Sequence, residues 1–353
     1  SEGEKCHAFD FNVTNLHAHG SHTRPDYARA GGCSPTDVLA CRECGDEDCD
    51  GDTGDDTCFH GDDVISTVHP AYGARYRWDI DEDGTHHEGL QWYHPHIHGT
   101  TAIQVASGAA GAWIVRGPVD ELQGIRDATE RVMVFSTPPI GDNAFEPLAD
   151  GESCTEDTLT FNNFGILSAT DSKQFNLING AYQPRLVAAP GQVERWRILH
   201  AGFLDEVFLG LTRGEDQDCT TWGGDLLPLT QIARDGLTLP LSYTDDYVFM
   251  SPGYRVDALV GGQDVFADGD TWCLVAGRFL QDDGAGQSVS PPEPPTTPEI
   301  LDLLRNSQGA SLVAILNITS DAGEATSTTL PDLVEVAATG PSTDIQGVDA
   351  DTR

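Results

Sequence analysis

The sequence predicts a mostly β protein of the sandwich type. Short runs of Val, Ile, Leu and Phe recur along the 353 residues, and 38 glycines and 20 prolines help to separate them. Short apolar runs between such turn residues are typical of antiparallel strands, whereas segments with helical periodicity are scarce. With 39% hydrophobic residues, the chain can pack the cores of two or three domains.

The charge and the cysteines bear on partners and location. The chain has 57 acidic and 19 basic residues, a net charge of −38 at pH 7. This excess repels nucleic acid and anionic membrane surfaces, so we expect neither as a partner. The apolar runs are broken by Gly or Ser, so we expect no membrane span. Nine cysteines favour an oxidising compartment, and we expect a secreted or periplasmic protein.

The first expected strand begins at the alternating residues Phe9, Phe11 and Val13. The chain then reaches His17 and His19. Residues i and i+2 of a strand share a face, so these two imidazoles would point the same way.

An insertion over residues 21–63 follows, rich in Cys, Asp and Gly and too poor in apolar residues to form its own core. Its cysteines and one that precedes it make an even number, which favours disulfides, with the pairing left open. We rank zinc lower because paired C-x-x-C knuckles are absent. These cysteines are Cys6, Cys33, Cys41, Cys44, Cys49 and Cys58.

Part of the insertion resembles a calcium loop. Asp46, Asp48, Asp50 and Gly51 match the first half of D-x-D-x-D-G, but Thr57 stands where that loop has its bidentate Glu. Calcium stays a candidate cofactor on these three aspartates. We favour a solvated acidic loop.

The stretch 92–115 carries a second histidine cluster. Interpreted as one strand, it would place His94, His96 and His98 on one face. One His-x-His pair is a weak signal, but two such regions in one small domain indicate a metal site. Neutral imidazole binds copper, zinc and iron, and periodicity does not choose among them.

A second β unit begins near residue 131, with enough strands for a sandwich. Loops are expected at 141–170 and 282–298, and the polar segment 319–353 is typical of a linker. Cys219 and Cys273 are a candidate pair that leaves Cys154 over. The strands are expected at 131–135, 175–178, 193–199, 229–232, 247–250, 256–260, 272–275 and 312–318.

Two motifs resemble those of the multicopper oxidases, the laccase-like family of cupredoxin domains. N-L-H-A-H-G at 15–20 is similar to the family's first copper motif, and W-Y-H-P-H at 92–96 to its second. Further segments resemble its middle domain, namely 175–180, 190–197, 235–236 and 251–257. The resemblance implies tandem cupredoxin-like Greek-key β-sandwiches.

The resemblance also implies a domain division. The first cupredoxin domain would span residues 1–118, with N-terminal strands missing, and the second 119–320. Residues 321–353 would form a linker or tail towards an absent third domain.

By position, the resemblance makes His17 the type 2 copper ligand, and His19, His94 and His96 ligands of the type 3 pair. His98 has no ligand role in the family. It would extend the site, hydrogen-bond a ligand's neighbour, or cap the strand. We treat His200 as structural, His86 and His87 as turn residues, and His22, His60 and His69 as surface groups.

The family's third domain supplies a His-x-x-His-x-His and a His-Cys-His segment, and neither occurs here, since the last histidine is His200. Type 1 copper would therefore need a C-terminal cupredoxin domain or a second chain. The implied activity couples oxidation of an unknown reducing substrate to reduction of O2 to water. The alternatives are a non-catalytic copper-binding or structural cupredoxin protein, and a zinc or calcium protein. We take Asp81, Glu82, Asp83 and Glu88 as solvated turn residues and assign no catalytic acid.

Overall fold

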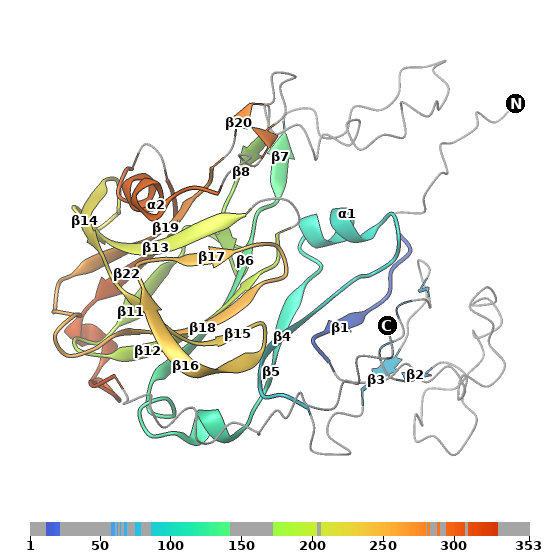
Figure 1. The fold of residues 1–353 in the computed structure, drawn as a ribbon, viewed down its shortest axis with the longest axis horizontal. Coiled ribbons are helices and arrows are strands. Elements are labelled where there is room, and N and C mark those ends of the chain that lie inside the picture. The colour runs from blue at the N-terminus through green and yellow to red at the C-terminus, as the bar shows by residue number, and fades with distance from the viewer. Residues whose placement is uncertain are drawn as a thin grey trace, which may run out of the picture.

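The computed structural model describes residues 12–21, 58–60, 62, 64, 67–68, 75–78, 86–141, 172–202, 206–279, 281–282, 288–289, 294–307 and 310–330. Strands dominate these ranges, which confirms the all-β prediction. They form a small sheet that carries the histidine motifs, and a larger sandwich of two sheets beside it (Figure 1).

Several predictions lie outside the described residues. They include the strand residues Phe9 and Phe11, the acidic residues 81–83, and most of the loop at 141–170. The insertion cysteines other than Cys58 also lie outside, as do Cys6, Cys154, His22 and His69. The domain boundaries stay a prediction.

The small sheet is antiparallel and has the order β1-β4-β5. Its strands are β1 (His17–His19), β4 (Gly89–His94) and β5 (Gly111–Val115). Pairing sets His17 opposite His94, and His19 opposite Trp92. The ladder thereby brings together histidines that are 75 residues apart, as His19 and His94 are.

The prediction of a continuous strand through the second histidine cluster is wrong. Strand β4 ends at His94, and a turn and the short helix α1 (Thr101–Ala106) precede β5. Pro95 has no amide hydrogen to donate to a ladder, and β1 begins opposite His94, so no partner strand continues. Gly108, with φ of 95°, follows the helix in the left-handed conformation that glycine adopts readily. His96 and His98 therefore lie beyond the strand.

The sandwich consists of a seven-stranded and a six-stranded sheet. In spatial order the first contains β10 (Ala181–Tyr182), β9 (Leu177–Ile178), β6 (Thr129–Ser136), β12 (Val193–His200), β18 (Arg255–Gly261), β15 (Leu229–Arg234) and β16 (Leu237–Asp245). The second contains β11 (Arg185–Ala188), β22 (Ser311–Ile318), β19 (Thr271–Gly277), β13 (Val207–Gly214) and β14 (Trp222–Leu226), with β17 (Val248–Met250) also paired to β13.

Each of the eight strand signals of the second unit overlaps a strand, whereas the sandwich strands β10, β11, β13, β14 and β16 were missed. Three two-stranded ladders and three more short helices complete the described elements. The ladders are β2 (Cys58–His60) with β3 (Arg75–Arg77), β7 (Pro139–Gly141) with β8 (Ser172–Gln174), and β20 (Gln281–Asp282) with β21 (Ser288–Val289). The helices are η2 (Pro118–Glu121), α2 (Thr297–Leu304) and η5 (Ser320–Ala322).

Helix α2 begins inside the segment that we predicted as a proline-rich loop. Glu299 accepts a hydrogen bond from the amide of Thr296 at 2.8 Å, which caps the first turn. Ile300 and Leu304, one turn apart, are buried, and Leu304 accepts a hydrogen bond from the indole of Trp222 at 3.1 Å. Among the described residues, no helix is long and apolar enough to cross a membrane.

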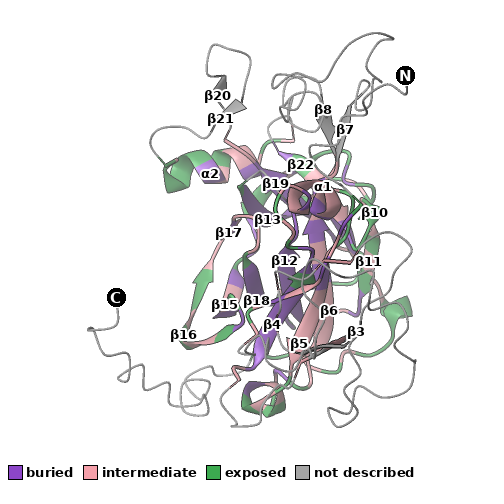
Figure 2. Cartoon of the chain, turned by 90° about the vertical axis from the view of Figure 1, so that its right-hand side faces the viewer, coloured by how far each residue is buried: buried purple, intermediate pink, exposed green. Residues whose placement is uncertain are grey.

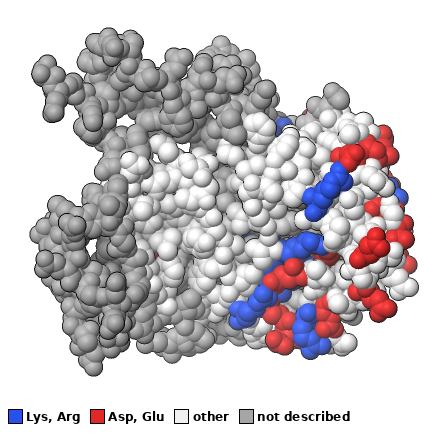
Figure 3. Space-filling view, turned by 180° about the vertical axis from the view of Figure 1, so that it is seen from behind, with Lys and Arg blue, Asp and Glu red and all other residues white. Residues whose placement is uncertain are grey.

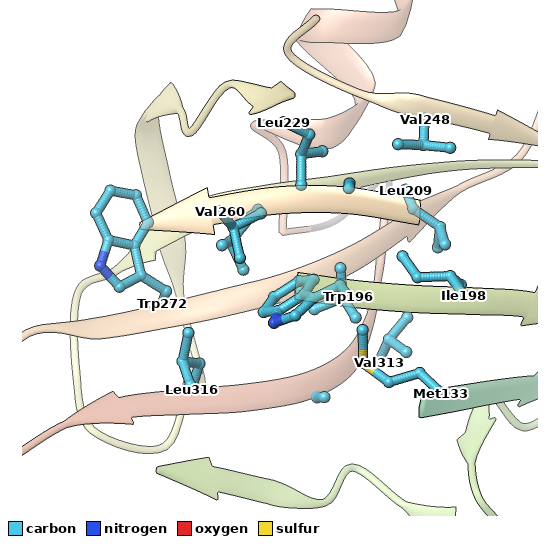
Figure 4. Packing of buried hydrophobic residues seen from close by; sticks show 14 of the residues in the cluster. Met133, Trp196, Ile198, Leu209, Leu229, Val248, Val260, Trp272, Val313 and Leu316 are labelled. Carbon is cyan, nitrogen blue, oxygen red and sulfur yellow. The ribbon is translucent and has the colours of Figure 1, made fainter. Parts of the chain in front are cut away.

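The main core lies between the two sheets of the sandwich. Every residue of β12 is buried, because this strand runs between β6 and β18. Trp196 and Ile198 pack there against Met133, Leu209 and Val313 of other strands (Figure 4). Burying an apolar side chain of this size contributes about 1.5–3 kcal/mol. Burial extends into β4, which carries the small sheet against the sandwich (Figure 2).

The side chains of Arg195 and Arg197 alternate with those core residues along β12 and lie on the other face of the sheet. Both bind Asp120 of η2, at 2.6 and 2.5 Å, and both bind Asp257 of β18, at 2.7 and 2.9 Å. Helix η2 follows β5 directly in the chain. This buried ion network therefore holds the segment that leaves the small sheet against the sandwich. Sequence patterning did not reveal it.

Candidate metal centre

Three of the predicted ligands form a compact cluster. The ligand atoms of His17, His19 and His94 all lie within 4.8 Å of one another. His19 Nδ1 is 3.4 Å from His94 Nε2. Two nitrogen atoms this close together can bind the same metal ion. The register of β1 against β4 creates this arrangement, since it sets His17 directly opposite His94.

His96 approaches the cluster from beyond the end of β4. Its ring centroid lies 4.8 Å from that of His17 and 5.7 Å from that of His94. The side chain of Asn15 accepts a hydrogen bond from the His96 amide at 2.6 Å and donates one to the Val64 carbonyl at 2.9 Å. Asn15 therefore takes the place of a ladder partner where the strand has stopped.

His98 does not share the position of the other histidines. It is exposed, in the turn that precedes α1, and within the described part of the chain no ring contact joins it to the cluster. The same-face prediction for His98 failed because it required an uninterrupted strand. Its role stays a prediction.

Asp62 contacts the cluster, which the sequence did not reveal. Its carboxylate accepts hydrogen bonds from His17 Nδ1 at 2.7 Å and from the Ala18 amide at 2.9 Å. Burial would raise the pKa of Asp62, but these hydrogen bonds outweigh it and hold the pKa below its usual value. A carboxylate only accepts, so His17 carries its proton on Nδ1 and presents Nε2 as a free donor atom.

His94 is oriented in the same way by the backbone. Its Nδ1 donates to the carbonyl of Pro95 at 2.8 Å, which leaves Nε2 directed towards a ligand. Burial lowers the pKa of His94 to about 4. Burial, and then the charge of Arg255, lower the pKa of His19 to about 4 as well. Both imidazoles are thus neutral at physiological pH, the form that binds metal.

Trp92 forms one wall of the cluster. Its ring stacks on that of His94, with centroids 4.0 Å apart and planes at 28°, and lies 5.1 Å from that of His19. Only 6% of Trp92 is exposed, so the wall keeps water from that side. Gly253 of the sandwich faces the same indole.

The donor set fits a borderline metal ion such as copper or zinc. Imidazole nitrogens converge, two of them with fixed tautomers, and among the described residues no thiolate joins them. Cys219 and Cys273 are joined in a disulfide, which confirms the predicted pairing and removes both as thiolate ligands. The calcium candidates Asp46, Asp48 and Asp50 lie outside the described residues.

Among the described residues, His200 lies outside this cluster. His200 is fully buried, and its Nδ1 accepts a hydrogen bond from the Gly202 amide at 3.0 Å, in agreement with a structural role.

Glu88, which we predicted as a solvated turn residue, is instead buried. It accepts hydrogen bonds from the Val119 amide at 3.2 Å and from the Thr238 hydroxyl at 3.3 Å. That prediction failed because Glu88 lies where the small sheet meets the sandwich.

No protein-family model matches the sequence, and no curated protein matches it. Solved structures do. The McoA multicopper oxidase from the hyperthermophile Aquifex aeolicus superposes with a TM-score of 0.52 at 17% identity, over 90% of this chain and 52% of that one. Its 2F4 variant gives 0.50 at 17% identity, over 91% and 53%.

The chain has a multicopper oxidase-like fold. It spans about half the length of the solved structures that it matches. Within this multicopper oxidase-like fold, the histidine cluster lies at the edge of the small sheet, at the junction with the sandwich.

Proposed function

We propose that this chain is the oxygen-reducing portion of a laccase-like multicopper oxidase. In this role it would couple the oxidation of a reducing substrate to the reduction of O2 to water. The observation that carries the proposal is the convergence of His17, His19 and His94, with His96 beside them, in a multicopper oxidase-like fold.

In the proposed site His17 is the type 2 copper ligand, and His19, His94 and His96 bind the type 3 pair. Copper, when bound, supplies one-electron redox chemistry. The residues of the chain orient the ligands and exclude water. Asp62 holds the proton of His17 on Nδ1, and Trp92 excludes water from one side. Calcium at Asp46, Asp48 and Asp50 stays a separate prediction.

The substrate-oxidising centre must come from elsewhere in this proposal. Type 1 copper needs a cysteine thiolate beside histidine, and the sequence has no His-Cys-His segment. We therefore propose that a C-terminal cupredoxin domain, in the same protein or in a second chain, completes the oxidase. The disulfide Cys219–Cys273 supports a secreted or periplasmic location, because such bonds persist in oxidising compartments.

A second candidate function is non-catalytic copper binding, and the absence of type 1 ligands from the sequence favours it. The two candidates differ in one measurable respect. An oxidase portion consumes O2 when it is supplied with copper and its complementary domain, whereas a copper-binding protein holds copper without turnover.

The test replaces both His94 and His96 by Ala and measures copper content, the electron paramagnetic resonance spectrum of Cu(II), and O2 uptake by the complete assembly. His98→Ala is the matched control, because His98 is exposed and lies outside the cluster. We expect the double variant to lose cluster copper and O2 reduction while the control retains both. Unchanged turnover in the double variant would refute the assignment, and copper binding without turnover in the wild-type assembly would support the second candidate.

A further inference from the structure

Arg255 of β18 reaches from the sandwich into the small sheet. Its side chain is 6% exposed and donates to the carbonyl of Leu90 at 3.2 Å and to Gln91 Oε1 at 3.0 Å, both in β4. It also donates to the backbone carbonyls of Gly253 at 3.0 Å and Asp235 at 2.7 Å. The guanidinium is therefore held between the two parts of the fold by uncharged oxygen atoms.

The charge of Arg255 is less well neutralised than the charges of the other buried arginines. Of the three arginines that the described residues bury, Arg195 and Arg197 bind carboxylates at 2.5–2.9 Å. Among the described residues, the carboxylate nearest to Arg255 is that of Asp235, at 3.6 Å and 48% exposed, where water screens this ion pair.

The exposed arginines follow the opposite pattern to Arg255. Arg116 binds Glu130 at 2.6 Å and Arg213 binds Asp270 at 2.7 Å. On the face shown in Figure 3, basic side chains lie beside acidic ones. Among the described residues, a buried guanidinium whose nearest carboxylate is half exposed and 3.6 Å away is an exception in so acidic a chain. Removing a charged guanidinium from water costs free energy. The position of Arg255 therefore raises the question of what its charge does there.

The guanidinium lies directly against the strand that carries a predicted metal ligand. A Cβ atom at Gly20, the residue after His19, would lie 3.0 Å from Arg255 Nη2 and 1.9 Å from Gln91 Oε1. Only glycine permits this close approach.

We propose that Arg255 influences which oxidation state of copper the centre prefers, by holding a buried, only partly compensated positive charge against the end of the strand that carries His19. The proposal rests on the proposed function. Repulsion between the guanidinium and a bound ion grows with the charge of the ion, so it opposes Cu(II) more than Cu(I). Arg255 thus biases the centre towards Cu(I), and does so from the sandwich, across the junction between the two parts of the fold.

Two variants remove the charge in different ways. Arg255→Met deletes the guanidinium together with its hydrogen bonds. Gln91→Glu keeps the guanidinium and places a carboxylate at the position of Gln91 Oε1, 3.0 Å from Nη2, with almost no change of shape. A merely structural arginine would be held at least as firmly by Gln91→Glu as by the native glutamine.

Two controls complete the set. Arg255→Lys retains the positive charge with fewer hydrogen bonds. Arg213→Met removes an exposed arginine that pairs with Asp270, away from the centre. If Arg255→Met fails to fold, Gln91→Glu still tests the proposal, because it preserves the contact.

The measurement is the affinity of the full chain for Cu(I), by anaerobic competition with bathocuproine disulfonate, and for Cu(II), by competition with nitrilotriacetate. We expect Gln91→Glu and Arg255→Met to lower the ratio of Cu(I) to Cu(II) affinity by about tenfold, the effect of one charge across a partly buried site. Arg255→Lys and Arg213→Met should leave the ratio within about twofold of the wild type.

The two possible failures are distinguishable. If the wild-type chain binds neither copper ion, the proposed function fails and this inference falls with it. If the wild type binds copper and Gln91→Glu leaves the affinity ratio unchanged, the proposed function stands and the role of Arg255 is overturned.

Discussion

Replacing Asp62 by Asn tests how the chain prepares His17 for a metal. The carboxylate accepts from two donors, His17 Nδ1 at 2.7 Å and the Ala18 amide at 2.9 Å. An asparagine has one accepting oxygen and one donating NH2 group, so whichever way it turns, one of those donors faces another donor. The change is nearly isosteric, and it removes the hydrogen-bonding pattern without opening a cavity.

A change of tautomer at His17 removes this clash between two donors at the lowest cost in free energy. If the NH2 group faces Nδ1, the imidazole moves its proton to Nε2, the atom that would bind the metal. Loss of such a supporting partner typically lowers metal affinity by 10- to 100-fold, or about 1.4–2.7 kcal/mol. We therefore expect Asp62→Asn to weaken copper binding by this factor.

The assay is a chelator competition for Cu(II) at neutral pH, with urea unfolding of the same samples to confirm that they are folded. Asp225→Asn is the matched control, since it removes the same charge from a fully exposed side chain. A folded Asp62→Asn protein that binds copper within twofold of the wild type would refute the role of Asp62.

Three further predictions concern stability, and urea unfolding measures each of them. Replacing both Cys219 and Cys273 by Ala should cost about 2–5 kcal/mol, because their disulfide spans 54 residues of chain; no loss would contradict this. Gly236→Ala should destabilise by more than about 1 kcal/mol, since φ is 77° and the new Cβ would lie 2.0 Å from a side-chain nitrogen of β4; a neutral result would argue against a tight junction. Metal-free protein should lose stability as pH falls from 6.5 towards 4. In that window the unfolded chain binds more protons at His19 and His94, whose folded pKa is about 4, and constant stability there would refute their burial.

The sandwich was predictable where strands carry continuous apolar runs. Strand β19 is an example, because burial of all its residues leaves a clear signal in T-W-C-L-V-A-G. Strand β16 was missed although its apolar residues alternate at Leu237, Leu239 and Leu241. It contains Pro240, which argues against a central strand but is tolerated in an edge strand such as this one.

The candidate centre was predictable to the extent that it depends on spacing. The His-x-His pattern singled out His17 and His19, and the register of β1 and β4 places them beside His94. Asp62 was not predictable, because it lies 45 residues from His17, near the end of the insertion rich in Cys, Asp and Gly, and only folding brings it to the imidazole.

The sequence by itself determined the fold class and the candidate metal-binding histidines, because strand periodicity and ligand spacing are local properties of the chain. Only the tertiary structure decided that β4 stops at His94, that Asp62 and Pro95 fix the imidazole tautomers, and that Arg255 brings a buried charge to the junction. Tautomer, desolvation and electrostatic field depend on atoms that are distant in sequence, so no local pattern encodes them.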